Sequence, residues 1–319
     1  MANTLLTIQM ITRECLRVLE NNLTFTKQIN KQYNDQFAKS GAKVGAVVNV
    51  RKPVRYTVSS GANLDLQNVT ETQVPVTLDQ QKHVDFEFSS VDMTLTIDDF
   101  SERYVRPAVA ALANQIDRDG LALYKQVFNL VGTPGTVPTA LLTYLSAGVA
   151  LDNNAAPQDD LRFLCITPKM QAYIVDGLKG LFQAGSTIAE QYRKGKMGSA
   201  IGFSWYMDQN VATHTNGGFG GTPVVRGADQ TGTSLVTEGW TASTATVKEG
   251  DVFTIAGVYQ VNPQSRQSTG ELQQLVVRAD ATSDGSGYMT LSIQPPITLA
   301  GAYQTVNALA ANLAAMTFS

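Results

Sequence analysis

The residues able to do chemistry are few and scattered. The 319-residue chain has two histidines, His83 and His214, and two cysteines, Cys15 and Cys165. A structural zinc site needs about four ligands at short spacings, and this set does not supply them. His83 falls in an alternating, strand-like stretch and His214 in a glycine-rich one, so we expect both side chains to be solvated. The cysteines lie far apart, which excludes a disulfide framework.

Carboxylate pairs are the remaining candidates for catalysis. Asp98 and Asp99, and likewise Asp159 and Asp160, are neighbours in sequence and are typical of helix caps or loops. A glycosidase pair formed across the fold stays open as an alternative. The sequence has no G-x-S-x-G elbow that would present a serine nucleophile. We therefore predict a protein that is not an enzyme and has no catalytic, cofactor-binding or metal-binding residues.

Two segments carry features that could contact phosphate. The glycine run at residues 217–221 lacks a G-K-[ST] sequence and opens no helix, so it is predicted to be a flexible linker. Arg193, Lys194 and Lys196 form a basic cluster that is typical of a solvated face. Contact with the phosphates of an enclosed nucleic acid is the alternative for this cluster.

Charge and composition narrow the class of protein. The 24 Lys and Arg residues against 27 Asp and Glu give a net charge of −3, without the basic excess of a dedicated nucleic-acid binder. Charged residues make up 16%, below the roughly 25% of an average soluble protein. The surface is therefore either rich in uncharged polar side chains or largely subunit contact. The sequence predicts neither a membrane span nor a signal peptide, and its length indicates about two domains.

Residues 1–42 predict a helical arm. One apolar stripe at three- and four-residue spacing consists of Ile8, Ile11, Cys15, Val18 and Leu19. The opposite face carries the charged residues Arg13, Glu14, Arg17 and Glu20. A short amphipathic helix cannot bury its stripe alone, so the arm must dock on its own body or on a neighbour.

Residues 43–97 change to a period of two, with β-branched residues that predict antiparallel strands. The alternating stretches include residues 44–50, 54–58, 74–78 and 84–88. Pro53 and Pro75 suggest edges or bends. A long two-stranded ribbon is marginal in water, so we expect it to lie on another part of this chain or on a second chain.

The rest of the chain predicts three further parts. Residues 98–137 contain the strongest helical pattern, which Gly132-Thr-Pro-Gly ends. Residues 138–212 have a mixed α/β pattern, and residues 213–300 have short, evenly spaced strands typical of a small barrel or sandwich. Residues 301–319 form an apolar tail of small residues.

Several stretches of sequence resemble a known family in the same order along the chain. They are Leu5–Glu14, Tyr33–Gly45, Ser101–Ala108, and Gly250–Pro263 with Gln267–Gly270. Together with the order of the elements, they resemble tailed-phage major capsid proteins of the shared capsid fold (the HK-ninety-seven type). The resemblance is greater to the coat-protein family of short-tailed Salmonella phages (the P-twenty-two type).

The resemblance implies an α+β phage capsid fold. Residues 1–42 would be the N-terminal arm, 43–97 an extended β-hairpin called the E-loop, and 98–137 the spine helix of the P domain. Residues 138–212 would be a mixed α/β A domain and 213–300 an inserted β barrel, the I-domain, followed by the C-terminal tail 301–319. In the family the chain returns after the insertion to complete the A and P domains, whereas this sequence stops at Ser319. We expect a truncated chain, a shortened family member or a different barrel boundary.

The implied function is that of a major capsid protein that self-assembles into an icosahedral shell. The implied partners are further copies of the chain in pentamers and hexamers, a scaffolding protein, a portal protein and enclosed double-stranded DNA, with no membrane and no cofactor. The protein would reside in the virion capsid and assemble in the host bacterial cytoplasm. An encapsulin-like nanocompartment shell and a β-rich binding protein are the alternatives.

Two sets of charged residues are the candidate contacts. Arg51, Lys52 and Arg55 form a basic cluster on a ribbon without a core of its own, and we expect them to pair with acidic groups on an adjacent subunit. The arm's charged face, which consists of Arg13, Glu14, Arg17 and Glu20, is the candidate contact with scaffolding protein.

Overall fold

The computed structural model describes residues 8–30, 45–64, 66–68, 71–85, 87, 97–178 and 198–319. The chain divides into two compact units. The first comprises Met1–Val54, Ser60–Leu121 and Tyr206–Val211, and the second comprises Arg55–Ser59, Ala122–Trp205 and Ala212–Ser319. The basic cluster at Arg193, Lys194 and Lys196 lies outside the described residues. None of the helices in the described ranges is long and apolar enough to span a membrane.

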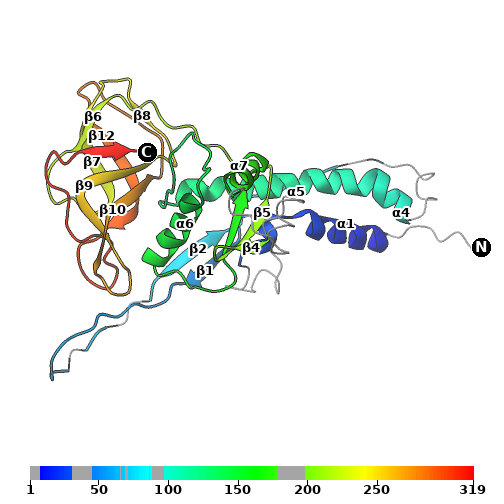
Figure 1. The fold of residues 1–319 in the computed structure, drawn as a ribbon, viewed down its shortest axis with the longest axis horizontal. Helices are drawn as coiled ribbons and strands as arrows, with labels where there is room; N and C mark the ends of the chain where they lie inside the picture. The colour runs from blue at the N-terminus through cyan, green and yellow to red at the C-terminus, as the bar shows by residue number, and fades with distance from the viewer. Residues whose placement is uncertain are drawn as a thin grey trace, which may run out of the picture. The chain divides into compact units, whose positions relative to one another are not determined.

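The first unit is built on a helical spine that carries the arm. The arm contains α1 (Ile8–Asn22) and the short α2 (Phe25–Gln28), and the spine contains α4 (Ile97–Phe100), a π-helix η2 (Ser101–Val105) and α5 (Arg106–Leu121). Helix α1 lies along the spine (Figure 1). Its apolar stripe packs into a small core whose buried members are Val18, Phe100, Val105 and Val109. The arm therefore docks on its own chain, one of the two expected outcomes.

The spine changes helix type at the place where proline requires it. Pro107 lacks an N–H, and its ring would crowd the carbonyl one turn earlier in a regular helix. The wider π-helix η2 directly precedes it, and the Arg106 N–H bonds to the Ser101 oxygen. After α5, the 3-10 helix η3 (Ala122–Gln126) begins the second unit. The helical run therefore ends before the glycine-proline sequence at residues 132–135 that was predicted to stop it.

The described residues of the ribbon form one two-stranded ladder. Strands β1 (Val47–Arg51) and β2 (Gln73–Thr77) are antiparallel, with Val47 opposite Thr77 and Arg51 opposite Gln73. The Lys52 N–H to Thr72 oxygen bond, 2.9 Å, is the last rung before the loop. Residues 54–58 and 84–88 were expected to be strands, but 54–58 lie in none, and neither do residues 84, 85 and 87, the described part of the second stretch. The prediction failed because alternation alone does not provide a pairing partner.

The α/β part of the second unit contains α6 (Leu141–Asn153), β3 (Phe163–Ile166), α7 (Pro168–Leu178), β4 (Ser199–Ala200) and the first three residues of β5 (Phe203–Met207), whose last two belong to the first unit. The three strands form a sheet in the order β3-β5-β4. Helices α6 and α7 supply Tyr144 and Ile174 to a core shared with Ile166, Phe203 and Trp205. The Tyr144 and Trp205 rings lie 5.2 Å apart, centre to centre.

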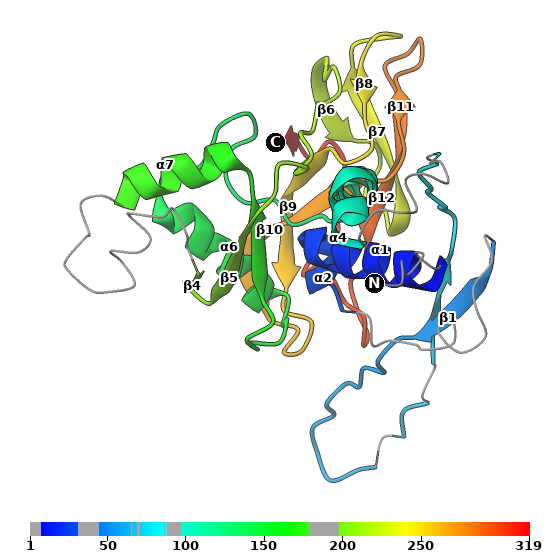
Figure 2. The same ribbon diagram turned by 90° about the vertical axis from the view of Figure 1, so that its right-hand side faces the viewer.

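The β module is a nearly closed barrel with its own apolar core (Figures 1 and 2). Its six-stranded sheet runs in the order β13 (Met316–Phe318), β9 (Val252–Val261), β10 (Ser268–Val277), β12 (Met289–Ile297), β7 (Gly232–Trp240), β6 (Gly221–Val225). Strands β8 (Thr246–Val247) and β11 (Ala281–Thr282) form a small second sheet.

The two edges of the six-stranded sheet meet at the end of the chain. The Val225 N–H donates to the Ala314 oxygen at 3.0 Å, and the Leu313 N–H donates to the Val225 oxygen at 2.9 Å. Val224 also forms a bridge with Ala315. Residues 313–318 therefore close the barrel, although the sequence assigned them to a tail beyond a barrel at 213–300.

Candidate functional site

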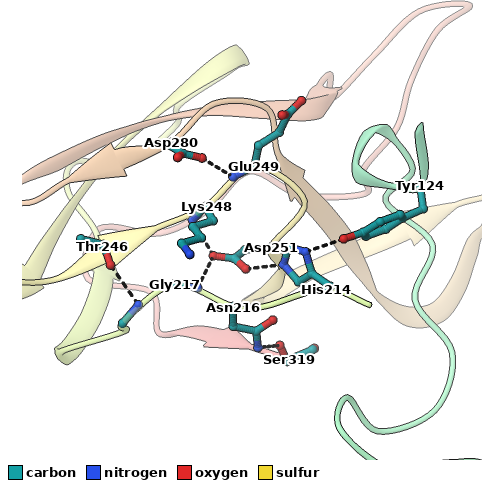
Figure 3. A network of polar contacts seen from close by, with 11 residues as sticks. Tyr124, His214, Asn216, Gly217, Thr246, Lys248, Glu249, Asp251, Asp280 and Ser319 are labelled. Atoms are coloured by element: carbon teal, nitrogen blue, oxygen red, sulfur yellow. Dashed lines mark hydrogen bonds and ion pairs between the residues drawn. The ribbon is translucent and has the colours of Figure 1, made fainter. Parts of the chain in front are cut away.

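A buried carboxylate organises the start of the barrel. The Asp251 side chain is fully buried, and its Oδ2 accepts hydrogen bonds from the Lys248 N–H at 2.7 Å and the Gly217 N–H at 3.1 Å. Its Oδ1 lies 2.8 Å from His214 Nε2 (Figure 3). A single carboxylate therefore joins the segment that leads into β6 to the turn between β8 and β9.

His214 extends this network to the second unit's first helix. Because a carboxylate can only accept, Nε2 carries the proton, and in the neutral ring Nδ1 then accepts from the Tyr124 hydroxyl at 2.9 Å (Figure 3). Partial burial, with the nearby negative charges of Asp251 and Glu249, raises the pKa of the Tyr124 hydroxyl. The prediction that His214 is solvated is wrong, because its side chain is only 21% exposed and is bonded on both nitrogens.

The glycine run at residues 217–221 is packed against the barrel, so the prediction of a flexible linker is also wrong. A Cβ atom on Gly217 would lie 2.3 Å from the Thr246 oxygen, and one on Gly221 would lie 2.3 Å from the Gly239 oxygen. The Gly218 N–H bonds to Thr246 Oγ1 at 3.0 Å. Glycine is required here because two backbones approach more closely than a side chain permits.

The hydrogen bonds of this network have a structural role. His83, the other histidine, is 74% exposed beside Asp85, as expected for a solvated residue. Within the described residues, no group of three or more His, Cys, Asp or Glu side chains is arranged to hold a metal ion. The donors and acceptors around Asp251 are used to fix three backbone segments relative to one another.

A polar joint links the barrel to the α/β part of the second unit. The Gln274 side chain accepts from the Leu130 N–H and donates to the Leu130 oxygen, both at 2.8 Å. Gln260 donates to Asn154 Oδ1 at 3.1 Å. These residues line a cleft of about 530 Å³. The joint consists of side-chain amides, and the two apolar cores on either side of it are separate.

The three predicted ribbon cations have different surroundings. Arg51 forms an exposed ion pair across the ladder, with 3.3 Å between its Nη1 and Glu71 Oε2. Lys52 is exposed, and no described residue forms an ion pair with it. The Arg55 guanidinium carbon lies 5.7 Å from the centre of the Tyr303 ring.

The predicted scaffold-contact residues divide in a similar way. Glu14 is only 14% exposed, because both of its oxygens bind Arg17 at 2.6 and 2.8 Å and one accepts from Ser101 Oγ at 2.7 Å. The hydrogen bonds from Arg17 and Ser101 lower the pKa of Glu14 from 4.5 to about 2. The expectation of an exposed Glu14 is therefore wrong. Arg13 and Arg17 are exposed, and the side chain of Glu20 lies outside the description.

A second carboxylate, which the sequence did not single out, fixes the arm to the spine. Asp117 is buried on α5, and its two oxygens accept from the Thr24 N–H at 2.7 Å and the Thr26 N–H at 2.9 Å. Both N–H groups lie at the start of α2, where backbone donors have no partner within the helix. The N-cap residue Thr24 makes no capping hydrogen bond with its side chain, so Asp117 takes this role. The signal in the sequence that could have revealed this contact is a charged residue, Asp117, at a position where the helical pattern places a buried side chain.

Comparison with known proteins gives the family. A family model described as P22 coat protein, gene protein 5, matches residues 1–318. No curated protein matches the sequence. Among solved structures, a chain from Mycobacterium phage Che8 is 16% identical, with 85% of this chain and 86% of that chain covered and a TM-score of 0.43. The CUS-3 coat protein I-domain is 24% identical, with 31% of this chain and 95% of that chain covered and a TM-score of 0.23.

The family match covers nearly the whole sequence. The family is one of structural coat proteins, which assemble with copies of themselves into the capsid of the virion. This chain therefore belongs to the P22 coat protein family, with an α+β phage capsid fold and the function of a major capsid protein.

Proposed function

We propose that this coat protein assembles in the host cytoplasm, with a scaffolding protein and a portal protein, into a shell that encloses double-stranded DNA. In this proposal, residues 1–42 are the N-terminal arm, 43–97 the E-loop, 98–137 the spine helix, 138–212 the A domain and 213–300 the inserted barrel. The residues beyond 300 contribute the closing strand of that barrel. Pentamers and hexamers of the chain repeat the same contacts around the shell.

The observation that carries the proposal is the exposure of the ribbon loop. Tyr56 is 60% exposed, Val58 93%, Leu64 85% and Leu66 82%. These large apolar side chains occur between residues 52 and 72, where none of the described residues lies in a strand. Several large, exposed apolar side chains on one loop favour an interaction surface. An adjacent subunit that covers the loop would remove this surface from water.

The basic residues beside this loop supply the electrostatic part of the contact. Arg51 already has Glu71 as an exposed partner within the ribbon, so its charge is partly neutralised. Lys52 and Arg55 remain the stronger candidates for pairing with acidic groups on an adjacent subunit. Such rim charges set the register and the rate of association more than the final affinity.

The arm is the proposed contact with scaffolding protein. Arg13 and Arg17 are exposed on α1, and Glu20 belongs to the same charged face in the sequence. Glu14 contributes indirectly, because its carboxylate accepts hydrogen bonds from Arg17 and from Ser101 and so positions the Arg17 side chain. A contact through exposed charges is weakened by salt, because screening shortens the range of the attraction.

The test of the proposed function is assembly with purified scaffolding protein, followed by sedimentation velocity and electron microscopy. We expect the natural chain to give closed, uniform shells and the double variant Lys52→Glu/Arg55→Glu to give a several-fold lower yield. Lys169→Glu, a charge reversal at an exposed position on α7, is the control for each of the single variants Lys52→Glu and Arg55→Glu, which change the charge by the same amount. An unchanged shell yield in the double variant would refute the role of the ribbon cations. Scaffold binding that is indifferent to salt and to Arg13→Glu would refute the role of the arm.

A further inference from the structure

The turn between β9 and β10 fixes one arginine in a defined place. The Asn262 N–H bonds to the Gln267 oxygen at 2.9 Å, and the Arg266 N–H bonds to the Asn262 oxygen at 2.8 Å. Asn262 Oδ1 accepts from two further N–H groups of the turn, those of Gln264 and Ser265. Arg266 itself has φ of 56°, a left-handed conformation that a non-glycine residue adopts only when its surroundings hold it there.

This arginine holds the tip of the ribbon loop. Its Nη2 donates to the Tyr56 carbonyl oxygen at 2.5 Å, while its Nε is buried and has no hydrogen-bond partner among the described residues. On the same loop, Arg55 lies over the ring of Tyr303. Residues 55–59 belong to the second compact unit, as do Arg266 and Tyr303, although the residues before and after them belong to the first. We define Arg266 and Tyr303 as the seat and residues 55–59 as the tip.

The seat covers only part of the tip. It bonds one peptide oxygen and covers one guanidinium, but it leaves Tyr56 at 60% and Val58 at 93% exposure. A buried guanidinium N–H without an acceptor is a rare condition in folded proteins, and a further acceptor would relieve it. The contact within one chain therefore consists of one hydrogen bond and one cation–π contact. It leaves apolar side chains of the tip exposed and the Arg266 Nε–H without an acceptor among the described residues.

We infer that, in the shell, the seat of one subunit receives the tip of a second copy of this chain. The inference rests on the proposed function of the ribbon as a contact between subunits. Every copy carries the same seat and the same tip, so each contact that forms within one chain can form between two chains. A neighbouring subunit would bring additional surface to cover Tyr56 and Val58, which the chain's own barrel leaves in water.

Cross-linking between two distinguishable chains tests this exchange. Both chains carry Cys15→Ser and Cys165→Ser, so that each has one reactive thiol. One chain carries Tyr56→Cys, which keeps the carbonyl oxygen that Arg266 binds, and the other carries Gln267→Cys and an affinity tag. A short bismaleimide is applied to co-assembled shells and to unassembled chains. We expect a cross-linked heterodimer in the shells and not in the unassembled mixture.

A single chain with both Tyr56→Cys and Gln267→Cys is the reference for the intramolecular contact. If shells of this chain cross-link only within the chain, or if neither arrangement cross-links in shells, the inference is overturned. Shells that form normally without the intermolecular product would overturn only this inference. Failure of the natural chain to form shells would instead overturn the proposed function.

Substitution of the seat provides an independent measurement. Arg266→Asn removes the donor to Tyr56 while asparagine tolerates the left-handed backbone, and Arg266→Lys retains a cation. We expect a several-fold loss of shell yield for Arg266→Asn, partial recovery for Arg266→Lys, and no change in the thermal midpoint of the monomer. Gln264→Ala, at an exposed side chain in the same turn, is the matched control. Equal shell yields for Arg266→Asn and Gln264→Ala would contradict the inference.

Discussion

His214 and Asp251 are 37 residues apart in sequence, and His214 Nε2 lies 2.8 Å from Asp251 Oδ1 inside the barrel. The same carboxylate accepts two backbone N–H groups, those of Gly217 and Lys248. A fully buried carboxylate with three donors resists replacement, because the loss of its charge leaves donors without acceptors. Asp251 therefore fixes residues 214–217, the segment that leads into β6, against the barrel.

Asp251→Asn should destabilise the barrel by about 2–4 kcal/mol, because an amide offers one acceptor oxygen where the carboxylate uses two. The measurement is urea unfolding of the full chain, followed by tryptophan fluorescence. Asp280→Asn is the matched control, since Asp280 is exposed and accepts a single backbone hydrogen bond, from Glu249. Equal unfolding midpoints for the two variants would contradict the role of Asp251.

Gly217→Ala should reduce stability by about 1–3 kcal/mol or prevent folding, since its Cβ would lie 2.3 Å from the Thr246 oxygen. Gly218→Ala is the matched control, because its nearest neighbour would be the Thr246 hydroxyl at 3.4 Å. Thermal unfolding of both variants tests whether residues 217–221 are packed against the barrel or form a flexible linker. A linker would tolerate either alanine, so equal stability of the two variants would contradict the packed arrangement.

Periodicity predicted the elements that bury one face. The stripe on α1, the α6 and α7 helices and the principal barrel strands follow from three-to-four and two-residue spacing. The loop around residues 54–58 alternates equally well but has no neighbouring strand to pair with. The closing strand β13 has only three residues, and it is defined by its partner β9 rather than by its own pattern. Periodicity does not contain this kind of long-range information.

The polar network was not predictable for a related reason. A histidine beside several glycines is typical of a solvated linker, and the residues that bury His214 lie 37 and 90 positions away. Likewise, Glu14 has the sequence position of a surface charge, and Ser101 binds it from 87 residues away. The capsid family could still be identified from sequence, because it depends on matches in order along the chain.

Glu14→Gln should loosen the arm from the spine by about 1–2 kcal/mol at neutral pH, since a neutral amide replaces a carboxylate that accepts from Ser101 and Arg17. Most of this effect comes from Ser101, because Arg17 is 58% exposed and its ion pair is screened by water. Urea unfolding followed by far-ultraviolet circular dichroism measures the difference. Glu102→Gln, at an exposed position of the same spine, is the control.

The effect of Glu14 should also depend on pH. Folding lowers the pKa of Glu14 from 4.5 to about 2, so the ionised form is favoured in the folded chain. The stabilisation is therefore complete above pH 4.5 and is lost as the pH falls from 4.5 towards 2. The difference between the natural chain and Glu14→Gln should shrink across that interval. A difference that stays constant from pH 6 to pH 3 would show that the carboxylate's charge is not involved.

Phe318→Ala should open the barrel where its two edges meet. The Phe318 ring lies 4.5, 5.0 and 5.5 Å from the ring centres of Phe219, Phe253 and Trp240. Removal of a large aromatic side chain that is only partly buried should cost about 2–4 kcal/mol, and the loss of β13 packing exposes the edge of β9. The tryptophan fluorescence of the unfolding transition reports this change, since Trp240 belongs to the cluster.

Leu313→Ala is the control for this prediction. Leu313 is 58% exposed, and its backbone N–H to the Val225 oxygen is unaffected by a shorter side chain. We expect Leu313→Ala to unfold close to the natural chain, and Phe318→Ala to unfold at a clearly lower urea concentration. Amide hydrogen exchange then locates the damage: protection should fall first in β9 and β6, the two strands that β13 and its preceding residues join. Full protection of both strands in Phe318→Ala would mean that the barrel remains closed without its last aromatic ring.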